Sequence, residues 1–185
     1  MNDAACRRTE AGYAMVHTLN KEQVVPARLE RIFTFFENPH NLALITPPSL
    51  AFRVVSPHPV TMQAGLEIDY SLRLGGLQLH WRSLISSYDP PHCFVDQQLI
   101  GPYASWRHTH RFARCEGGTL LQDEVVYSLP EYLPGFVEKL AHGCYVEPFL
   151  KRVFDYRARF YQSFFNGGSC HNERHRPQPD KERLS

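Results

Sequence analysis

Apolar and polar residues alternate through the middle of the chain, which is the period of a β-strand with one buried face. One alternating stretch covers residues 66–74 and another covers residues 77–82. Gly75-Gly76 between them suits a two-residue hairpin turn, because such turns need positive φ angles. Centring the turn on the glycines puts apolar residues opposite each other, namely Leu72 with Leu79 and Tyr70 with Trp81. The pattern therefore predicts a β-hairpin with this register.

The same alternation marks further strands. They are predicted at Tyr13–Val25, 94–99, 106–112 and 121–127, with turns at Gly101-Pro102 and at Glu116-Gly117-Gly118. Pro130 and Pro134 are expected to end the region of strands, because proline cannot donate a ladder hydrogen bond.

Two segments have a helical period instead. One starts at Pro26, whose ring suits the first turn of a helix, and is expected to end at Asn38, before Pro39. A short helical turn is expected at 41–45. The other helical segment covers residues 135–165, where Pro148 either kinks one helix or starts a second. The recurring apolar side chains are Leu29, Ile32, Phe33 and Phe36 in the first segment, and Phe149, Val153, Phe160 and Phe164 in the second, flanked by Phe154 and Tyr161.

This order of elements predicts an α+β fold in which a curved antiparallel sheet is closed over by the last helix. A curved sheet and one long helix do not easily fill the space between them, and large aromatic side chains point inward from both. We therefore expect an internal cavity that is mainly apolar with a few placed polar groups.

Composition narrows the class of protein. The chain has 185 residues, 43% of them hydrophobic, with a net charge of +1, so a nucleic-acid partner is not expected. Residues 12–165 are predicted to form one domain, and the polar segments 1–11 and 166–185 are predicted to be disordered. The N-terminus lacks the apolar core of a secretory signal, and no apolar run suits stable membrane insertion. Five widely spaced cysteines fit reduced thiols, and a cytoplasmic location is expected.

Several short motifs together resemble the START-like (SRPBCC) superfamily. Within it, the chain resembles a bacterial group sometimes fused to a sugar-nucleotide epimerase-like domain. The residues that carry the resemblance are Leu42–Phe52, Gly101-Pro102-Tyr103, Trp106-x-His108-x-His110-x-Phe112, Gly117-Gly118-Thr119 through Asp123 to Tyr127, and Phe154-x-Tyr156-Arg157.

The resemblance implies a helix-grip fold, in which a curved antiparallel seven-stranded sheet wraps around a long C-terminal helix and leaves an internal cavity. Members bind lipids, sterols, polyketides or quinones, and some act as cyclases or hydrolases. The resemblance also suggests a separately encoded epimerase-like protein as a partner. No cofactor is implied, and the chain lacks the dinucleotide-binding fingerprint of an epimerase.

Two histidines are the main candidates for chemistry. Alternation puts His108 and His110 on one strand face with Trp106, and this face is expected to be buried because the other carries arginines. The register across the following turn places His110 opposite Asp123, His108 opposite Val125 and Trp106 opposite Tyr127. The register across the preceding turn places Asp96 opposite His108 and Gln98 opposite Trp106. The sequence thus predicts a polar cluster of Asp96, His108, His110, Asp123 and Tyr127. The predicted ligand-binding residues are Tyr70, Trp81, Asp96, Trp106, His108, His110, Asp123 and Tyr127.

Three interpretations of this cluster stay open at this point. A buried His–Asp pair can simply satisfy its own hydrogen bonds. It can orient the polar end of a small hydrophobic or amphipathic ligand, such as a lipid, polyketide or quinone-like molecule. It can also act in an enzyme of the cyclase or dehydratase kind, with His110 as general base and Asp123 as its orienting partner. His-x-His on a strand with a carboxylate opposite can also form a facial set of metal ligands. No metal is predicted, however, because no later strand offers another histidine and Cys170, His171 and His175 lack zinc-site spacing.

Overall fold

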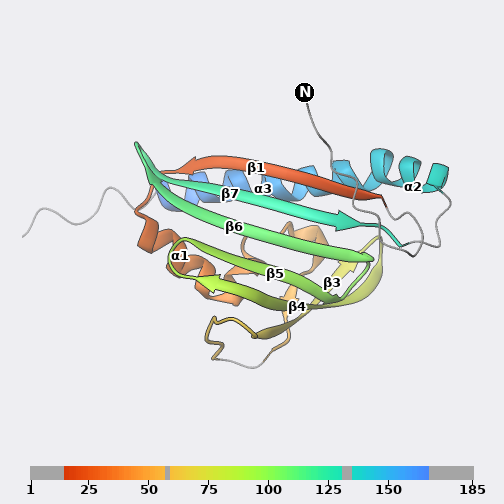
Figure 1. The fold of residues 1–185 in the computed structure, drawn as a ribbon, viewed down its shortest axis with the longest axis horizontal. Helices are drawn as coiled ribbons and strands as arrows, with labels where there is room; N and C mark the ends of the chain where they lie inside the picture. The colour runs from red at the N-terminus through yellow and green to blue at the C-terminus, as the bar shows by residue number, and fades with distance from the viewer. Residues whose placement is uncertain (1–14, 57–58, 131–134, 167–185) are drawn as a thin grey trace, which may run out of the picture.

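A single curved β-sheet organises the molecule. The computed structural model describes residues 15–56, 59–130 and 135–166. All strand pairs are antiparallel, and the seven-stranded sheet has the order β1-β7-β6-β5-β4-β3-β2 (Figure 1). The strands are β1 (Val16–Val25), β2 (Arg53–Val54), β3 (Glu67–Leu74), β4 (Leu77–Asp89), β5 (Cys93–Ile100), β6 (Ser105–Cys115) and β7 (Gly118–Ser128). The α+β helix-grip prediction is thereby confirmed.

The predicted strand registers are largely confirmed. Tyr70 pairs with Trp81 across β3 and β4, and His110 pairs with Asp123 across β6 and β7. Asp96 lies opposite His108 as expected, but the ladder between β5 and β6 ends before Gln98 could pair with Trp106. Strand β4 runs seven residues past its predicted end at position 82, with register shifts next to Ser83 and Ile85. Such bulges bend a strand, so they help to curve the sheet.

Helix α1 (Leu29–Glu37) begins three residues later than predicted. The backbone N–H of Ala27 donates to the carbonyl of Val25, and Arg28 is extended at φ −67° and ψ 146°, so a tight turn separates the strand from the helix. The helix ends before Asn38, which is extended as the residue before a proline should be. Short 3₁₀ turns follow at Pro39–Ala43 and Pro48–Leu50, so the turn expected at 41–45 starts two residues earlier.

The C-terminal helical segment contains α2 (Gly135–Ala141), a π-helical turn at His142–Val146 and α3 (Glu147–Asn166). Pro148 lies in the first turn of α3, directly after the π-helical turn, so the helical segment continues through the proline without a break. The predicted apolar stripe was partly wrong, because Phe164 is exposed. The side chains that α3 buries are Leu150, Val153, Phe154, Tyr161 and Phe165.

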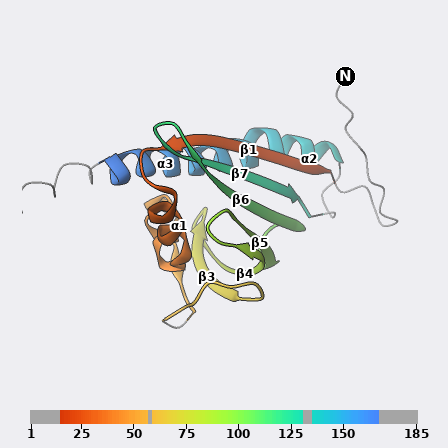
Figure 2. The ribbon, with the colours of Figure 1, turned by 60° about the vertical axis from the view of Figure 1, so that its left-hand side comes forward.

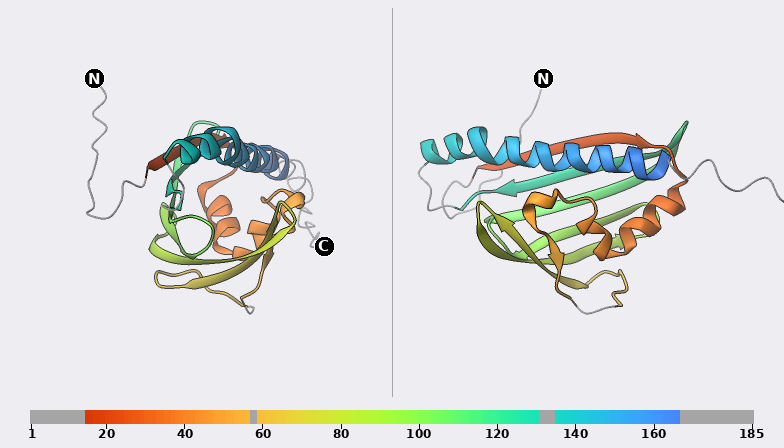
Figure 3. Two further views of the ribbon diagram at one scale, coloured as in Figure 1. Left: turned by 90° about the vertical axis from the view of Figure 1, so that its right-hand side faces the viewer. Right: turned by 180° about the vertical axis from the view of Figure 1, so that it is seen from behind.

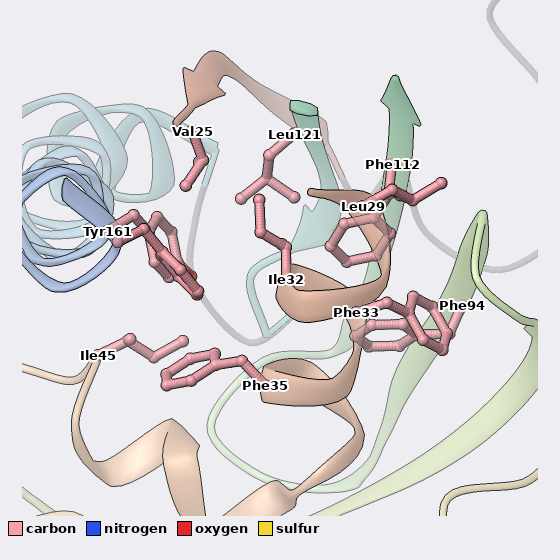
Figure 4. Packing of buried hydrophobic residues seen from close by; sticks show 11 residues of the cluster. Val25, Leu29, Ile32, Phe33, Phe35, Ile45, Phe94, Phe112, Leu121 and Tyr161 are labelled. Carbon is pink, nitrogen blue, oxygen red and sulfur yellow. The ribbon is translucent and has the colours of Figure 1, made fainter. Parts of the chain in front are cut away.

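Helix α3 runs along the concave side of the sheet, and α1 lies beneath one end of it (Figures 2 and 3). Leu29, Ile32, Phe33 and Phe35 from α1 pack with Phe112 and Leu121 from the sheet and with Tyr161 from α3 (Figure 4). This cluster fills one end of the space between sheet and helix.

No helix in the described part of the chain is both long and apolar enough to cross a membrane. The predicted disordered segments 1–11 and 166–185 lie outside the described residues, apart from Asn166, which ends α3. Tyr13 and Pro134 of the sequence predictions, and the cluster of Cys170, His171 and His175, also lie outside them.

Candidate functional site

A cavity of about 180 Å³ lies between the concave face of the sheet, α1, α3 and the segment that includes the two 3₁₀ turns. Most of its wall is aliphatic or aromatic. The aromatic residues that line it are Phe35, Phe36, Phe52, Tyr70, Trp81, Phe94, Tyr103, Trp106 and Phe149. Trp81 and Trp106 meet edge to face with ring centroids 5.4 Å apart, so the two indoles hold each other in a fixed orientation.

One part of the wall is polar and charged. His108 and His110 from β6 lie beside Asp96 from β5 and Asp123 from β7, and both imidazoles and Asp123 are almost fully buried. Asp96 keeps 18% of its side-chain surface exposed. Strand pairing places these four side chains together, because β6 lies between β5 and β7 and all four residues project from the same face.

Each imidazole contacts both carboxylates. Asp123 Oδ1 lies 3.0 Å from His108 Nε2 and 2.7 Å from His110 Nδ1. Asp96 Oδ2 lies 3.6 Å from His108 Nδ1 and 3.4 Å from His110 Nε2. Only the contact between His108 and Asp123 has the geometry of a hydrogen bond, and His110 Nδ1 has no well-aligned partner. The two imidazole rings are 3.8 Å apart, so the four groups form one compact unit.

The charges within this unit are strongly coupled. Burial alone would raise the pKa of Asp123, but the close contacts and the charges of the two imidazoles hold it far below the ordinary value. The pKa of Asp96 is likewise lowered, since the two imidazoles and Arg157 outweigh its burial. Burial and the neighbouring His110 lower the pKa of His108. For His110, burial opposes protonation, but Asp123 and Asp96 outweigh it and raise the pKa.

The structure adds Arg157 to the candidate site. This residue projects from α3 into the cavity wall, its guanidinium carbon lies 5.0 Å from the centroid of the Phe154 ring, and its buried Nε has no hydrogen-bond partner. The signal was present in the sequence, because Arg157 follows Val153 and precedes Tyr161 at helical spacing on the buried face. An arginine inside an apolar stripe marks a place where a ligand can supply the missing acceptor.

The predicted site residues fall into two groups. Six line the cavity, namely Tyr70, Trp81, Asp96, Trp106, His108 and His110. Asp123 does not line it, since it contacts the imidazole nitrogens that face away from Asp96. Tyr127 is also outside the polar unit, because its hydroxyl hydrogen-bonds with His142 Nε2 at 2.8 Å. Tyr127 does not line the cavity, although its ring centroid lies 5.8 Å from that of Trp106, which does.

Solved structures of several different kinds of protein share this fold. The di-domain ARO/CYC StfQ from the steffimycin biosynthetic pathway is similar with a TM-score of 0.66 and 17% identity, over 82% of this chain and 51% of that chain. Protein TTHA0849 from Thermus thermophilus is similar with a TM-score of 0.64 and 16% identity, over 83% and 99% of the two chains. Major latex-like protein 151 from Panax ginseng has a TM-score of 0.57 and 12% identity, over 81% and 97%.

The sequence itself matches no protein-family model and no curated protein. The likeness to these structures confirms the START-like helix-grip fold that the sequence resemblance implied. At these identities it extends to the fold alone.

Proposed function

We propose that the chain binds one small amphipathic ligand in the cavity between the sheet and α3. The observation that carries the proposal is the combination of an apolar, aromatic wall with a half-buried arginine, Arg157, whose buried Nε–H is unpaired. Binding sites for small molecules are concave and mainly apolar, and a few polar groups fix the orientation of the ligand. Similar folds include a di-domain ARO/CYC, which is compatible with a cavity used for small organic molecules.

The size of the cavity narrows the class of ligand. A volume of about 180 Å³ is close to the roughly 150 Å³ engineered cavity that holds a benzene molecule. This favours a compact ligand of one or two rings, such as a quinone-like molecule or a small aromatic acid, over a long-chain lipid. Trp81 and Trp106 would contact the ring faces and edges, and Arg157 would bind an acidic or carbonyl oxygen at the polar end.

Replacing Arg157 with methionine tests the polar end of this site. The probes are 2-naphthoate and its neutral relative 2-naphthamide, measured by calorimetry on the full chain. Because a hydrogen bond to a charged group contributes about 1.5–3 kcal/mol, we expect Arg157→Met to weaken naphthoate binding roughly 10- to 150-fold. The affinity for naphthamide should change much less, since it carries no charge.

Arg159→Met is the matched control, because Arg159 is an exposed residue on the same helix. It should leave the binding of both probes unchanged. Equal binding of naphthoate by the wild type and by Arg157→Met would contradict the assigned role of Arg157. Native mass spectrometry of the purified protein supplies a second test, and the absence of any retained molecule together with no binding of either probe would refute the proposed function.

A second candidate function is acid–base catalysis in the same cavity. The observation in its favour is that His110 lines the cavity and has Asp123 behind it at 2.7 Å, which is the arrangement of a general base and its orienting partner. Enzymes of the cyclase or dehydratase kind remove a proton next to a carbonyl group. The relevant probe is 2-tetralone, whose exchange of α-protons in deuterated water is followed by NMR.

If His110 acts as this base, His110→Gln should reduce protein-catalysed exchange by about 100-fold or more and leave the melting temperature nearly unchanged. His80→Gln is the control, because His80 also pairs with an aspartate, Asp69, but on an exposed part of the sheet. Exchange that is no faster with the wild type than in buffer would exclude this function for ketones of this size. A large loss of stability in His110→Gln would indicate a structural role instead.

The epimerase-like partner suggested by the resemblance is a separate proposal. Apolar side chains that a protein partner could cover are exposed where α2 meets the π-helical turn, namely Phe136, Leu140 and Tyr145. Recovery of an epimerase-like protein with the tagged chain, and its loss when Phe136 and Leu140 are replaced with serine, would support such a complex.

A further inference from the structure

The polar part of the cavity wall has the donor atoms of a metal site. We propose that Asp96, His108 and His110 bind one divalent transition-metal ion, with Asp123 holding the two imidazoles from behind. One donor atom from each of the three residues lies within 4.8 Å of the other two. Metal binding depends on these side chains alone, so this inference stands apart from the proposed binding of an organic ligand.

The distances fit a shared ion better than they fit hydrogen bonds. Asp96 Oδ2 is 3.6 Å from His108 Nδ1 and 3.4 Å from His110 Nε2. Hydrogen bonds between nitrogen and oxygen are shorter, at about 2.7–3.2 Å. Two donors that each lie about 2.1 Å from one tetrahedral ion are about 3.4 Å apart. Both distances from Asp96 to the histidines therefore match the spacing of ligands that share one ion.

The second nitrogen of each imidazole explains the role of Asp123. A neutral imidazole has one N–H and one lone pair, and a carboxylate can only accept. The shorter contacts run from Asp123 to His108 Nε2, which is hydrogen-bonded, and to His110 Nδ1 at 2.7 Å, so Asp123 lies beside the nitrogen of each ring that faces away from Asp96. When both imidazoles are neutral, the remaining lone pairs face the carboxylate of Asp96, and one metal ion shared by the three groups would satisfy them. Histidine ligands in metal sites commonly donate their other N–H to a carboxylate in this way.

Burial and access also suit a functional ion. Asp96, His108 and His110 line the cavity and Asp123 does not, so the ion would be reached from the cavity and held from the protein side. Two imidazoles and one carboxylate favour Zn²⁺, Fe²⁺ or Co²⁺ over Ca²⁺ or Mg²⁺, which prefer all-oxygen sites. Three protein ligands leave at least one coordination position for a water molecule or for an oxygen atom of a ligand.

Sequence reasoning set a metal aside because no later strand supplies a histidine. The third donor comes from the earlier strand, since β5 pairs with β6 and places Asp96 opposite His108, as the predicted register has it. The two histidines of one strand and the aspartate of its neighbour thus form the set of ligands without any further histidine.

The test is titration of the chelator-treated full chain with Co²⁺ and with Zn²⁺. We expect one ion per chain by calorimetry, visible absorption bands from bound Co²⁺, and an increase in melting temperature with Zn²⁺. Asp96→Asn should weaken binding by about 100-fold or more and abolish the absorption bands. Asp123→Asn should weaken it about 10- to 100-fold, since this residue only positions the ligands.

Two controls separate this site from other metal binding. His80→Gln removes an exposed histidine that also contacts an aspartate, and it should bind both ions as the wild type does. The double variant Cys170→Ser, His171→Ala tests the C-terminal segment in the same manner. The proposal is overturned if the wild type binds no stoichiometric ion, if folded Asp96→Asn binds with wild-type affinity, or if the Cys170 and His171 variant abolishes binding.

Discussion

Replacing Asp123 with alanine should lower the free energy of unfolding by about 3–5 kcal/mol, because removal of one partner from a buried charged pair leaves the others unsatisfied. Asp123 is only 6% exposed and contacts two imidazoles that are themselves buried. Without the carboxylate, His108 loses its hydrogen bond and any proton on His110 loses its closest negative charge. Urea denaturation monitored by circular dichroism measures the loss.

Asp69→Ala is a suitable comparison, since Asp69 is also an aspartate in a strand and also contacts a histidine, His80. Its side chain is 26% exposed and its partners His80 and Arg82 are exposed as well, so we expect a loss of about 1 kcal/mol or less. Equal losses of unfolding free energy for the two variants would show that burial does not make the contacts of Asp123 more stabilising than those of Asp69.

Replacing Gly118 with alanine should be at least as damaging. A Cβ atom at this position would lie 2.2 Å from the carbonyl oxygen of Val25, and the φ angle of +144° is one that residues with side chains rarely adopt. The obstacle is backbone, which cannot rotate away, where β7 begins beside the turn between β1 and α1. We expect a loss of about 4 kcal/mol or more, or failure of the protein to fold.

Gly76→Ala isolates the contribution of the clash. Gly76 also has a positive φ angle, +87°, but a Cβ atom there would meet nothing within 4 Å. This variant should lose only about 1–2 kcal/mol from backbone strain. Thermal and urea unfolding of both variants provide the comparison, and similar losses would mean that the close approach of β7 to the first turn is not important for stability.

The hairpin registers were predictable because each strand has one apolar face. A shift of one residue would have turned Tyr70 and Trp81 to the solvent, so alternation and glycine turns left few choices. The same reasoning located His110 opposite Asp123 and Asp96 opposite His108 from the sequence alone. Most of the polar unit therefore follows from local pattern and turn position.

Features that depend on packing between distant elements were not predictable in this way. The two-residue β2 has no period of its own, and α1 begins late because Ala27 hydrogen-bonds within the preceding turn. Strand alternation placed Tyr127 on the same face as Asp123, but alternation does not reveal that the π-helical turn covers this end of β7. Arg157 was missed as a site residue although its spacing from Val153 and Tyr161 puts it on the buried face, because only the structure shows that it lines the cavity.

The position of β1 has a consequence for how the chain can be made. This strand pairs along its whole length with β7, and α3 holds it through an ion pair between Lys21 and Asp155 and a hydrogen bond from Gln162 to the carbonyl of Val24. During synthesis on the ribosome, β1 and α1 emerge long before these partners exist. The nascent chain therefore carries an unpaired first strand until β7 has emerged, and the apolar face of α1 lacks its contacts with α3 for longer still, an interval in which both are open to wrong association.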